Sequence, residues 1–334
     1  MPAMSREAVS GVVTQKLSVP ELAEVLGTGQ AQAAKRLLSM QRTLRKTRNL
    51  RQRPTLDTKL VTGWNMLMAL VLIEAGNLPG GHRYIKAASE NMESILAVWK
   101  ADNTIPHCIY PDRSTTAGLL EDWAAVALAC LSMAQHTGDS AYLLQGTAIA
   151  EAMVTHFGPG HNPYRRWLDA MPGDDLICPP FMVDDMPTPS GRSLAALLFA
   201  KLATITGKRQ WQIMGEEIAG ELCDAMERSP LSLPAMALSI IALLGERRLV
   251  TLPPATEKNR PLLQLARTWS DPGLVCIPEH LAIYLEALPA DAEARSPASA
   301  TENVQVCLGS QCLAPANSTA QLAAQLAGSS PLAS

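Results

Sequence analysis

The stretch GLLEDWAAVALACLSMA, residues 118–134, decides the fold class. After its first turn nearly every position is alanine, leucine, valine, methionine or cysteine, so no polar face remains. An apolar segment of this length, built mostly from unbranched side chains, favours a helix that is buried all round. Residues 59–75, 190–205 and 233–244 have the same character, and we expect four buried helices.

Amphipathic segments alternate with these buried ones. Within residues 82–100, one stripe collects the apolar side chains Ile85, Ala88, Met92, Ile95, Leu96 and Trp99, with charged residues opposite. Residues 141–157 and 209–228 behave alike. Such alternation predicts an all-α protein of helical hairpins, in which one helix of each pair faces an inner ring and the other faces solvent.

Composition agrees with an ordinary globular chain. It has 334 residues, 47% of them hydrophobic, only 4% aromatic, and a net charge of −3. The most apolar run, residues 60–73, is shorter than the roughly 20 residues that a membrane-spanning helix needs. We find no signal peptide at the N-terminus, so we expect a cytoplasmic protein with no membrane contact.

Three parts are expected along the chain: a flexible N-terminus at 1–17, a helical-hairpin region at 18–245, and a mixed strand, loop and helix appendage at 246–334. Helices are expected from Ser18 to Gly27 and from Gln30 to Leu50. The second bears eight cations up to Arg53 with no interleaved aromatic residue, which favours a solvated or interdomain face over nucleic-acid binding. The appendage contains the β-like runs RRLVTL, GLVCIPE and NVQVCL, a loop at 289–301 and a weak helix at 318–328.

Polar residues gather where the buried helices begin. They are Asp57, Lys59, Trp64 and Asn65 before or in the first helix, Glu121, Asp122 and Trp123 in the second, and Ser190 and Arg192 in the third. Helix N-termini have unpaired N–H groups and partial positive charge, so the common rim suits anions or carbonyl and hydroxyl oxygens.

Each acid at this rim also has a structural interpretation. Asp57 is placed to cap a helix N-terminus, and Glu121 and Asp122 to complement a helix dipole. Asp184 and Asp185 lie in the loop before the third buried helix, where paired carboxylates suit acid-base chemistry and solvated loop acids are the alternative.

Four motifs in order resemble the spermatogenesis-associated, thioredoxin-domain family (YyaL-like proteins) over about residues 35–328. They are R-x-R-P-x-L-D-x-K-L-x-T-x-W-N, LLEDWA, D-x-x-P-T-P-S-G-R-S and VQVCLGSQCLAP. The resemblance implies an (α/α)6-type toroid of the six-hairpin glycosidase kind, incomplete here, and it implies that the family's thioredoxin-like domain is missing. Thr58 stands where the family has a second acid, Met66 where it has a glycine, and Arg192 where it has an asparagine.

Cysteines form a second constellation. Cys307 and Cys312 match a cysteine pair of the family, and Cys276 and His280 lie nearby in sequence. These four residues are weak candidates for a zinc site, a redox or structural disulfide is a second possibility, and reduced thiols are the third. We expect no cofactor.

Two functions follow from these observations. In the first, the rim binds or processes a sugar-like molecule. Its catalytic candidates are Asp57, Lys59, Glu121, Asp122 and Asp185. Its binding candidates are Trp64, Asn65, Trp123, Ser190 and Arg192. No histidine matches a rim position, which argues against a toroid-type epimerase. In the second, the chain is a non-catalytic subunit that completes its ring with a thioredoxin-domain partner or as a homo-oligomer.

Overall fold

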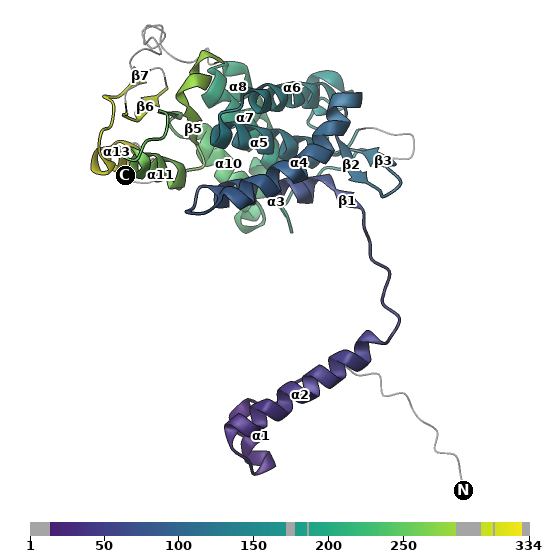
Figure 1. Cartoon of the computed structure of the whole chain (residues 1–334). Coiled ribbons are helices and arrows are strands. Elements are labelled where there is room, and N and C mark those ends of the chain that lie inside the picture. The colour runs from purple at the N-terminus through teal and green to yellow at the C-terminus, as the bar shows by residue number, and fades with distance from the viewer. Residues whose placement is uncertain (1–13, 172–177, 186, 285–301, 310, 329–334) are drawn as a thin grey trace. The chain divides into compact units, whose positions relative to one another are not determined.

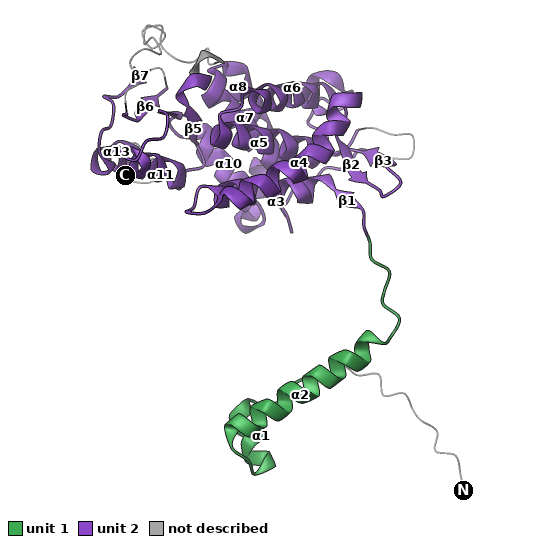
Figure 2. Cartoon of the chain, viewed as in Figure 1, with its two compact units in different colours: residues 1–57 green, residues 58–334 purple. Residues whose placement is uncertain are grey.

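The computed structural model describes residues 14–171, 178–185, 187–284, 302–309 and 311–328 (Figure 1). The chain divides into two compact units, residues 1–57 and 58–334 (Figure 2). This division falls between Asp57 and Thr58, whereas the three-part division at residues 17 and 245 stays a prediction.

Within its described residues, the first unit contains two helices, α1 (Val19–Leu26) and α2 (Gln30–Asn49). Ser18 begins α1, since its backbone N and its hydroxyl donate to the Glu21 carboxylate at 2.8 and 2.6 Å. Gly27 ends α1 with a φ of 59°, which suits glycine. Both predicted helices are confirmed.

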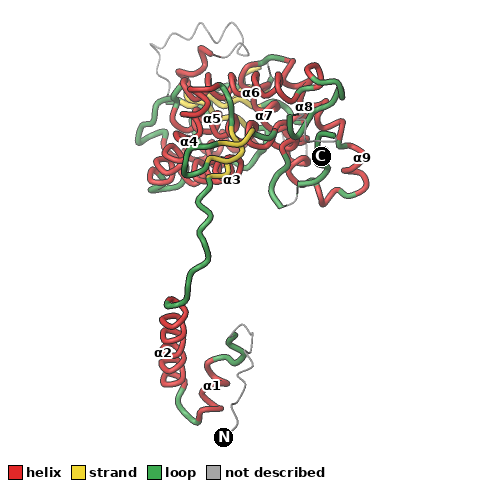
Figure 3. Tube along the Cα trace, turned by 90° about the vertical axis from the view of Figure 1, so that its right-hand side faces the viewer, coloured by secondary structure: helices red, strands yellow, loops and turns green. Residues whose placement is uncertain are grey.

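The second unit is built mainly from helical hairpins, and helices dominate its trace (Figure 3). The helices are α3 (Thr62–Gly76), α4 (His82–Asp102), α5 (Leu120–Thr137), α6 (Ser140–Phe157), α7 (Gly191–Thr206), α8 (Arg209–Glu221), α9 (Cys223–Arg228) and α10 (Pro234–Leu244). In what we call the first row, α3, α5, α7 and α10 pack side by side in that order. Helices α4, α6 and α8 form a second row, each against its hairpin partner. The mostly helical fold is confirmed, while closure into a toroid stays a prediction.

Burial differs between the middle and the ends of the first row. Helices α5 and α7 are buried over most of their surface, as predicted. The prediction is wrong for α3, where Trp64 is 64% exposed and Val71 64% exposed, and for α10, where Leu238 is 51% exposed. The reason is that α3 and α10 are the end helices of the first row and each has a first-row neighbour on one side only. The composition of a helix does not show whether its other side is covered.

Two small sheets complete the second unit. Strands β1 (Leu60–Val61), β2 (Pro106–Ile109) and β3 (Thr115–Ala117) form an antiparallel sheet that we did not predict from the sequence. Its importance is that it connects the start of α3 to the segment before α5.

The C-terminal sheet has the strand order β5-β4-β6-β7. Its strands are β4 (Arg248–Leu252), β5 (Leu274–Pro278), β6 (Gln305–Leu308) and β7 (Gln311–Cys312), with β4 and β5 parallel and the other pairs antiparallel. Helices α11 (Arg260–Thr268) and α13 (Thr319–Ala327) contact each other beside it and share a small core with it. The three β-like runs and the weak terminal helix are confirmed, and the predicted loop at 289–301 lies outside the described residues.

Among the described residues, we find no helix that has both the length and the apolar character needed to span a bilayer.

Candidate functional site

A buried carboxylate connects the N-terminal ends of α3 and α5. Asp122, in the first turn of α5, is fully buried. Its Oδ1 accepts a 2.8 Å hydrogen bond from the backbone N of Gly63 in α3. Its Oδ2 accepts from the backbone N of Leu119 at 2.9 Å and lies 2.9 Å from Nδ1 of His107. Amides that two helix starts would otherwise leave unpaired are thus satisfied by one side chain.

His107 belongs to this rim, which corrects the expectation that no histidine lies there. His107 lies on strand β2. Its neighbour Cys108 pairs with Val61, the residue immediately before α3, and this pairing brings His107 to the rim. The imidazole is 31% exposed, and within the described part of the chain its Nε2 has no hydrogen-bond partner. The structure shows alternating buried and half-buried residues over Pro106–Ile109, but four residues are too few for this strand to be recognised from the sequence.

Glu121 lies beside this pair and is half-buried. Burial raises the pKa of its carboxyl group above the ordinary range, and the charge of Asp122 raises it further. Burial also raises the pKa of Asp122, against the opposing effect of the hydrogen bond from Leu119. The rim therefore combines an oriented imidazole with a carboxyl group that holds its proton to a higher pH than usual.

One ligand atom from each of His107, Glu121 and Asp122 lies within 4.8 Å of the others, so the set could hold a divalent cation by ligand type. However, the oxygens of Asp122 already accept bonds from Gly63, Leu119 and His107. We therefore interpret the group as a hydrogen-bonded Asp122–His107 pair with a neighbouring acid, and not as a metal site.

The predicted binding residues on α3 and α5 separate into one exposed ring and two structural residues. Trp64 follows Gly63 and exposes 64% of its surface at the rim. Asn65 instead donates from Nδ2 to the Val61 carbonyl at 2.8 Å, which closes the first turn of α3. Trp123 is buried against Trp99, with ring centroids 5.9 Å apart, and belongs to the core.

The predicted residues around α7 are occupied by structural contacts. Arg192 is fully buried, with its guanidinium in ion pairs to Asp169 and Glu221 and 4.0 Å above the Phe181 ring. Asp185 Oδ1 accepts from the backbone N of Ser190 at 2.9 Å, and Oδ2 accepts from two amides in the first turn of α10. Ser190 caps α7.

Asp57 and Lys59 are both exposed, and Asp57 is the last residue of the first unit. The structural interpretation of Asp57 as a helix cap is wrong, because α3 begins at Thr62 and the residue at the N-cap position is Val61. The catalytic role of both residues stays a prediction.

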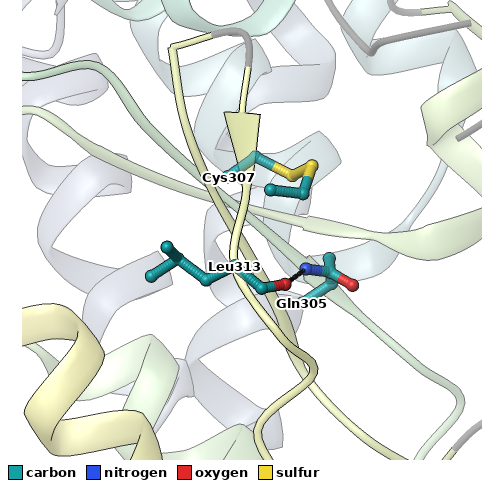
Figure 4. The surroundings of a disulfide bond; sticks show 4 residues. Gln305, Cys307 and Leu313 are labelled. Atoms are coloured by element: carbon teal, nitrogen blue, oxygen red, sulfur yellow. Dashed lines mark hydrogen bonds between the residues drawn. A yellow bond between two sulfur atoms is a disulfide. The ribbon is translucent and has the colours of Figure 1, made fainter. Parts of the chain in front are cut away.

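The cysteine candidates do not form a single metal site among the described residues. Cys307 and Cys312 form a disulfide across the β6–β7 pair (Figure 4). The Cys276 thiol donates to the Ala266 carbonyl at 3.4 Å, and His280 Nε2 lies 2.8 Å from the Gly138 carbonyl. The disulfide interpretation therefore replaces the zinc and reduced-thiol interpretations for Cys307 and Cys312.

Comparison with known proteins gives one distant relative and no family model that matches the chain. The relative is spermatogenesis-associated protein 20 of Rattus norvegicus, with 23% identity over 244 residues. The match covers 69% of this chain and 31% of that protein, so the chain spans under a third of its relative's length. It supports a distant relation to the family that the four motifs resemble.

Proposed function

We propose that the rim formed by the starts of α3 and α5 binds a sugar-like, polyhydroxylated molecule and transfers a proton to or from it. The observation that supports this most is the pairing of His107 with buried Asp122 beside Glu121. Asp122 orients the imidazole and leaves Nε2 facing away from the carboxylate as the group that exchanges the proton. Glu121, with its raised pKa, is the complementary acid.

Trp64 supplies the binding surface in this proposal. An exposed tryptophan ring stacks on the apolar face of a sugar ring, while carboxylates accept hydrogen bonds from its hydroxyl groups. A glycosidase mechanism is less favoured, because the carboxylate oxygens of Asp122 and Asp185 already accept hydrogen bonds from backbone amides and side chains. The proposed proton transfer uses His107 and Glu121 and requires no second free carboxylate.

The test uses the full chain in deuterated water. Monosaccharides and nucleotide sugars are screened by thermal shift, and each ligand found is followed by NMR for exchange of its C–H protons with solvent. We expect His107→Gln and Glu121→Gln each to slow the exchange about 100-fold or more, the usual size of a general acid-base contribution. His82→Gln, at an exposed position of α4, is the matched control. Equal exchange in wild type and both rim variants would exclude this mechanism.

A second candidate function is supported by the ends of the first row. Trp64, Met68 and Val71 form an exposed apolar stripe along α3, and Leu238 and Leu244 are exposed on α10. Large apolar stripes of this kind mark association surfaces. We propose that α3 of one copy packs against α10 of a second copy, which extends the row from one chain to the next.

Two variants that each block one end test this head-to-tail contact by analytical ultracentrifugation. Val71→Glu blocks the α3 end and Leu238→Glu blocks the α10 end, so each alone should sediment as a monomer. Their mixture keeps one intact interface and should form a dimer. A monomeric wild-type chain would exclude self-association and favour a different partner, such as a thioredoxin-domain protein. A variant that still dimerises alone would instead indicate an interface between two copies of its unchanged helix, and a mixture that stays monomeric would contradict the head-to-tail contact.

A further inference from the structure

A polar cavity lies at the other ends of the first-row helices, away from the rim. Its volume is about 120 Å³. The walls come from the C-terminal parts of α3, α5 and α7 on one side and from α11 and β5 on the other. The cavity therefore lies where the helical rows meet the C-terminal sheet.

Two cations, Lys201 and Arg267, line this cavity. Lys201 of α7 and Arg267 of α11 form no hydrogen bond or ion pair with any residue that the structure describes. Nε of Arg267 is buried and unpaired. A buried donor with no acceptor is costly, so we expect an acceptor that is not among the residues the structure describes.

The acids in the wall do not neutralise these cations directly. Asp271 is engaged by Arg248 at 2.5 Å and also accepts from the backbone N of Gly273 at 2.8 Å. Glu74 is exposed and accepts a 3.4 Å hydrogen bond from Asn77. Asp271 is thus paired with Arg248, whereas Glu74 forms no ion pair among the described residues and is the acid of the wall that competes most directly with an incoming anion.

The remaining polar wall adds neutral donors and acceptors. His136 forms a 2.9 Å hydrogen bond with Asn77 through Nδ1. Burial, with a smaller effect from the charge of Arg267, lowers the pKa of His136 to about 4, so the ring is neutral at pH 7. Burial raises the pKa of Cys276 to about 12, so its thiol is neutral too. Burial lowers the pKa of Lys201, against the raising effect of the charges of Glu74 and Asp271, and it also lowers the pKa of Arg267. The charged groups of the cavity wall are therefore Lys201, Arg267, Glu74 and Asp271.

We propose that this cavity binds a small anion of the phosphate or carboxylate class, held between Lys201 and Arg267. A guanidinium offers two parallel donors to either kind of oxyanion, and an ammonium group adds a point charge. The volume admits an anion of a few heavy atoms but not a nucleotide. Because the two binding side chains come from α7 and α11, a bound anion would connect the helical rows to the C-terminal part of the second unit. This site is independent of the acid-base rim.

Calorimetric titration of the full chain with sodium phosphate, sulfate, malonate and acetate, at constant ionic strength in chloride, tests the proposal. Stronger binding of phosphate and sulfate would indicate a phosphate site, and stronger binding of malonate and acetate a carboxylate site. Lys201→Gln and Arg267→Gln should each weaken binding about 10- to 100-fold, the range for one charged hydrogen-bonding partner. Arg260→Gln, an exposed position on the same helix as Arg267, should bind like wild type.

Glu74→Gln adds a result that general damage to the fold would not produce. Removal of the competing negative charge should strengthen anion binding several-fold. If Arg267→Gln does not fold, Lys201→Gln and Glu74→Gln still decide the question. The proposal is overturned if none of the four anions binds wild type, or if Arg260→Gln loses as much affinity as the two cavity variants.

Discussion

Asp185→Ala is predicted to destabilise the second unit strongly, although Asp185 looks like a catalytic acid in the sequence. The side chain is 5% exposed. It accepts hydrogen bonds from Ser190 N at 2.9 Å, Ser193 Oγ at 2.7 Å, Ala235 N at 2.9 Å and Met236 N at 3.2 Å. One carboxylate thus holds the start of α7 against the start of α10.

The magnitude follows from those bonds. Loss of a helix N-cap costs about 0.5–2 kcal/mol, and alanine would remove this function from α10. A buried donor left without an acceptor costs about 1–3 kcal/mol, which applies to the buried Ser190 amide. Since the bonds share one carboxylate and neighbouring groups rearrange, we expect a total of about 3–4 kcal/mol. That corresponds to a fall in Tm of roughly 6–16 °C for a unit of this size.

Urea unfolding of the full chain, followed by circular dichroism, measures the effect. Asp184→Ala is the matched control, because Asp184 is the adjacent acid and has no hydrogen-bond partner in the described ranges. Asp185→Asn should fall between wild type and Asp185→Ala, since one oxygen acceptor remains. Stabilities of Asp185→Ala and Asp184→Ala within about 0.5 kcal/mol of each other, the usual range for surface substitutions, would refute this reasoning.

Three further predictions concern stability. Because the pKa of Glu121 is raised in the folded state, its favourable contribution to stability is present below about pH 4.5 and is lost as pH rises through the folded-state pKa. Glu121→Gln should therefore become more stable relative to wild type as pH rises toward 7. The difference in Tm between the two proteins across pH 4–8 measures this effect. Reduction of the Cys307–Cys312 disulfide should cost about 2 kcal/mol for so short a loop, and reductant should leave the Tm of the double serine variant unchanged. Gly191→Ala should destabilise by about 1–3 kcal/mol in urea unfolding, because its Cβ would lie 2.7 Å from the backbone N of Glu121; wild-type stability would contradict the close packing of α7 on α5.

Local signals explain why much of the helical fold was predictable. The continuous apolar surface of residues 118–134 needs neighbours on every side, and α5 has α3, α7 and α6 around it. Helix ends also followed from nearby chemistry, as with Ser18 and Gly27 around α1. The sheet β1-β2-β3 was missed because its strands are two to four residues long and because a whole hairpin, α3 and α4, separates β1 from β2.

The candidate site shows the same limit at the level of single residues. Sequence position alone indicated that Glu121, Asp122 and Trp64 gather at helix starts, and they do. Sequence position could not show that the carboxyl group of Glu121 is left for chemistry, whereas the carboxylate of Asp185 accepts hydrogen bonds from backbone amides. That distinction depends on which distant N–H groups come within 3 Å of each oxygen.

The sequence by itself determined the helices of the hairpins, their order and the polar character of the rim, because periodicity and capping act over a few residues. Helix α11 was not predicted. Only the tertiary structure decided that His107 meets Asp122, that Arg192 is buried in ion pairs, and that Lys201 faces a cavity beside Arg267. Each of these relations joins residues at least 15 positions apart. Hydrogen bonds and charges act through space, so their partners are known only after the chain has packed.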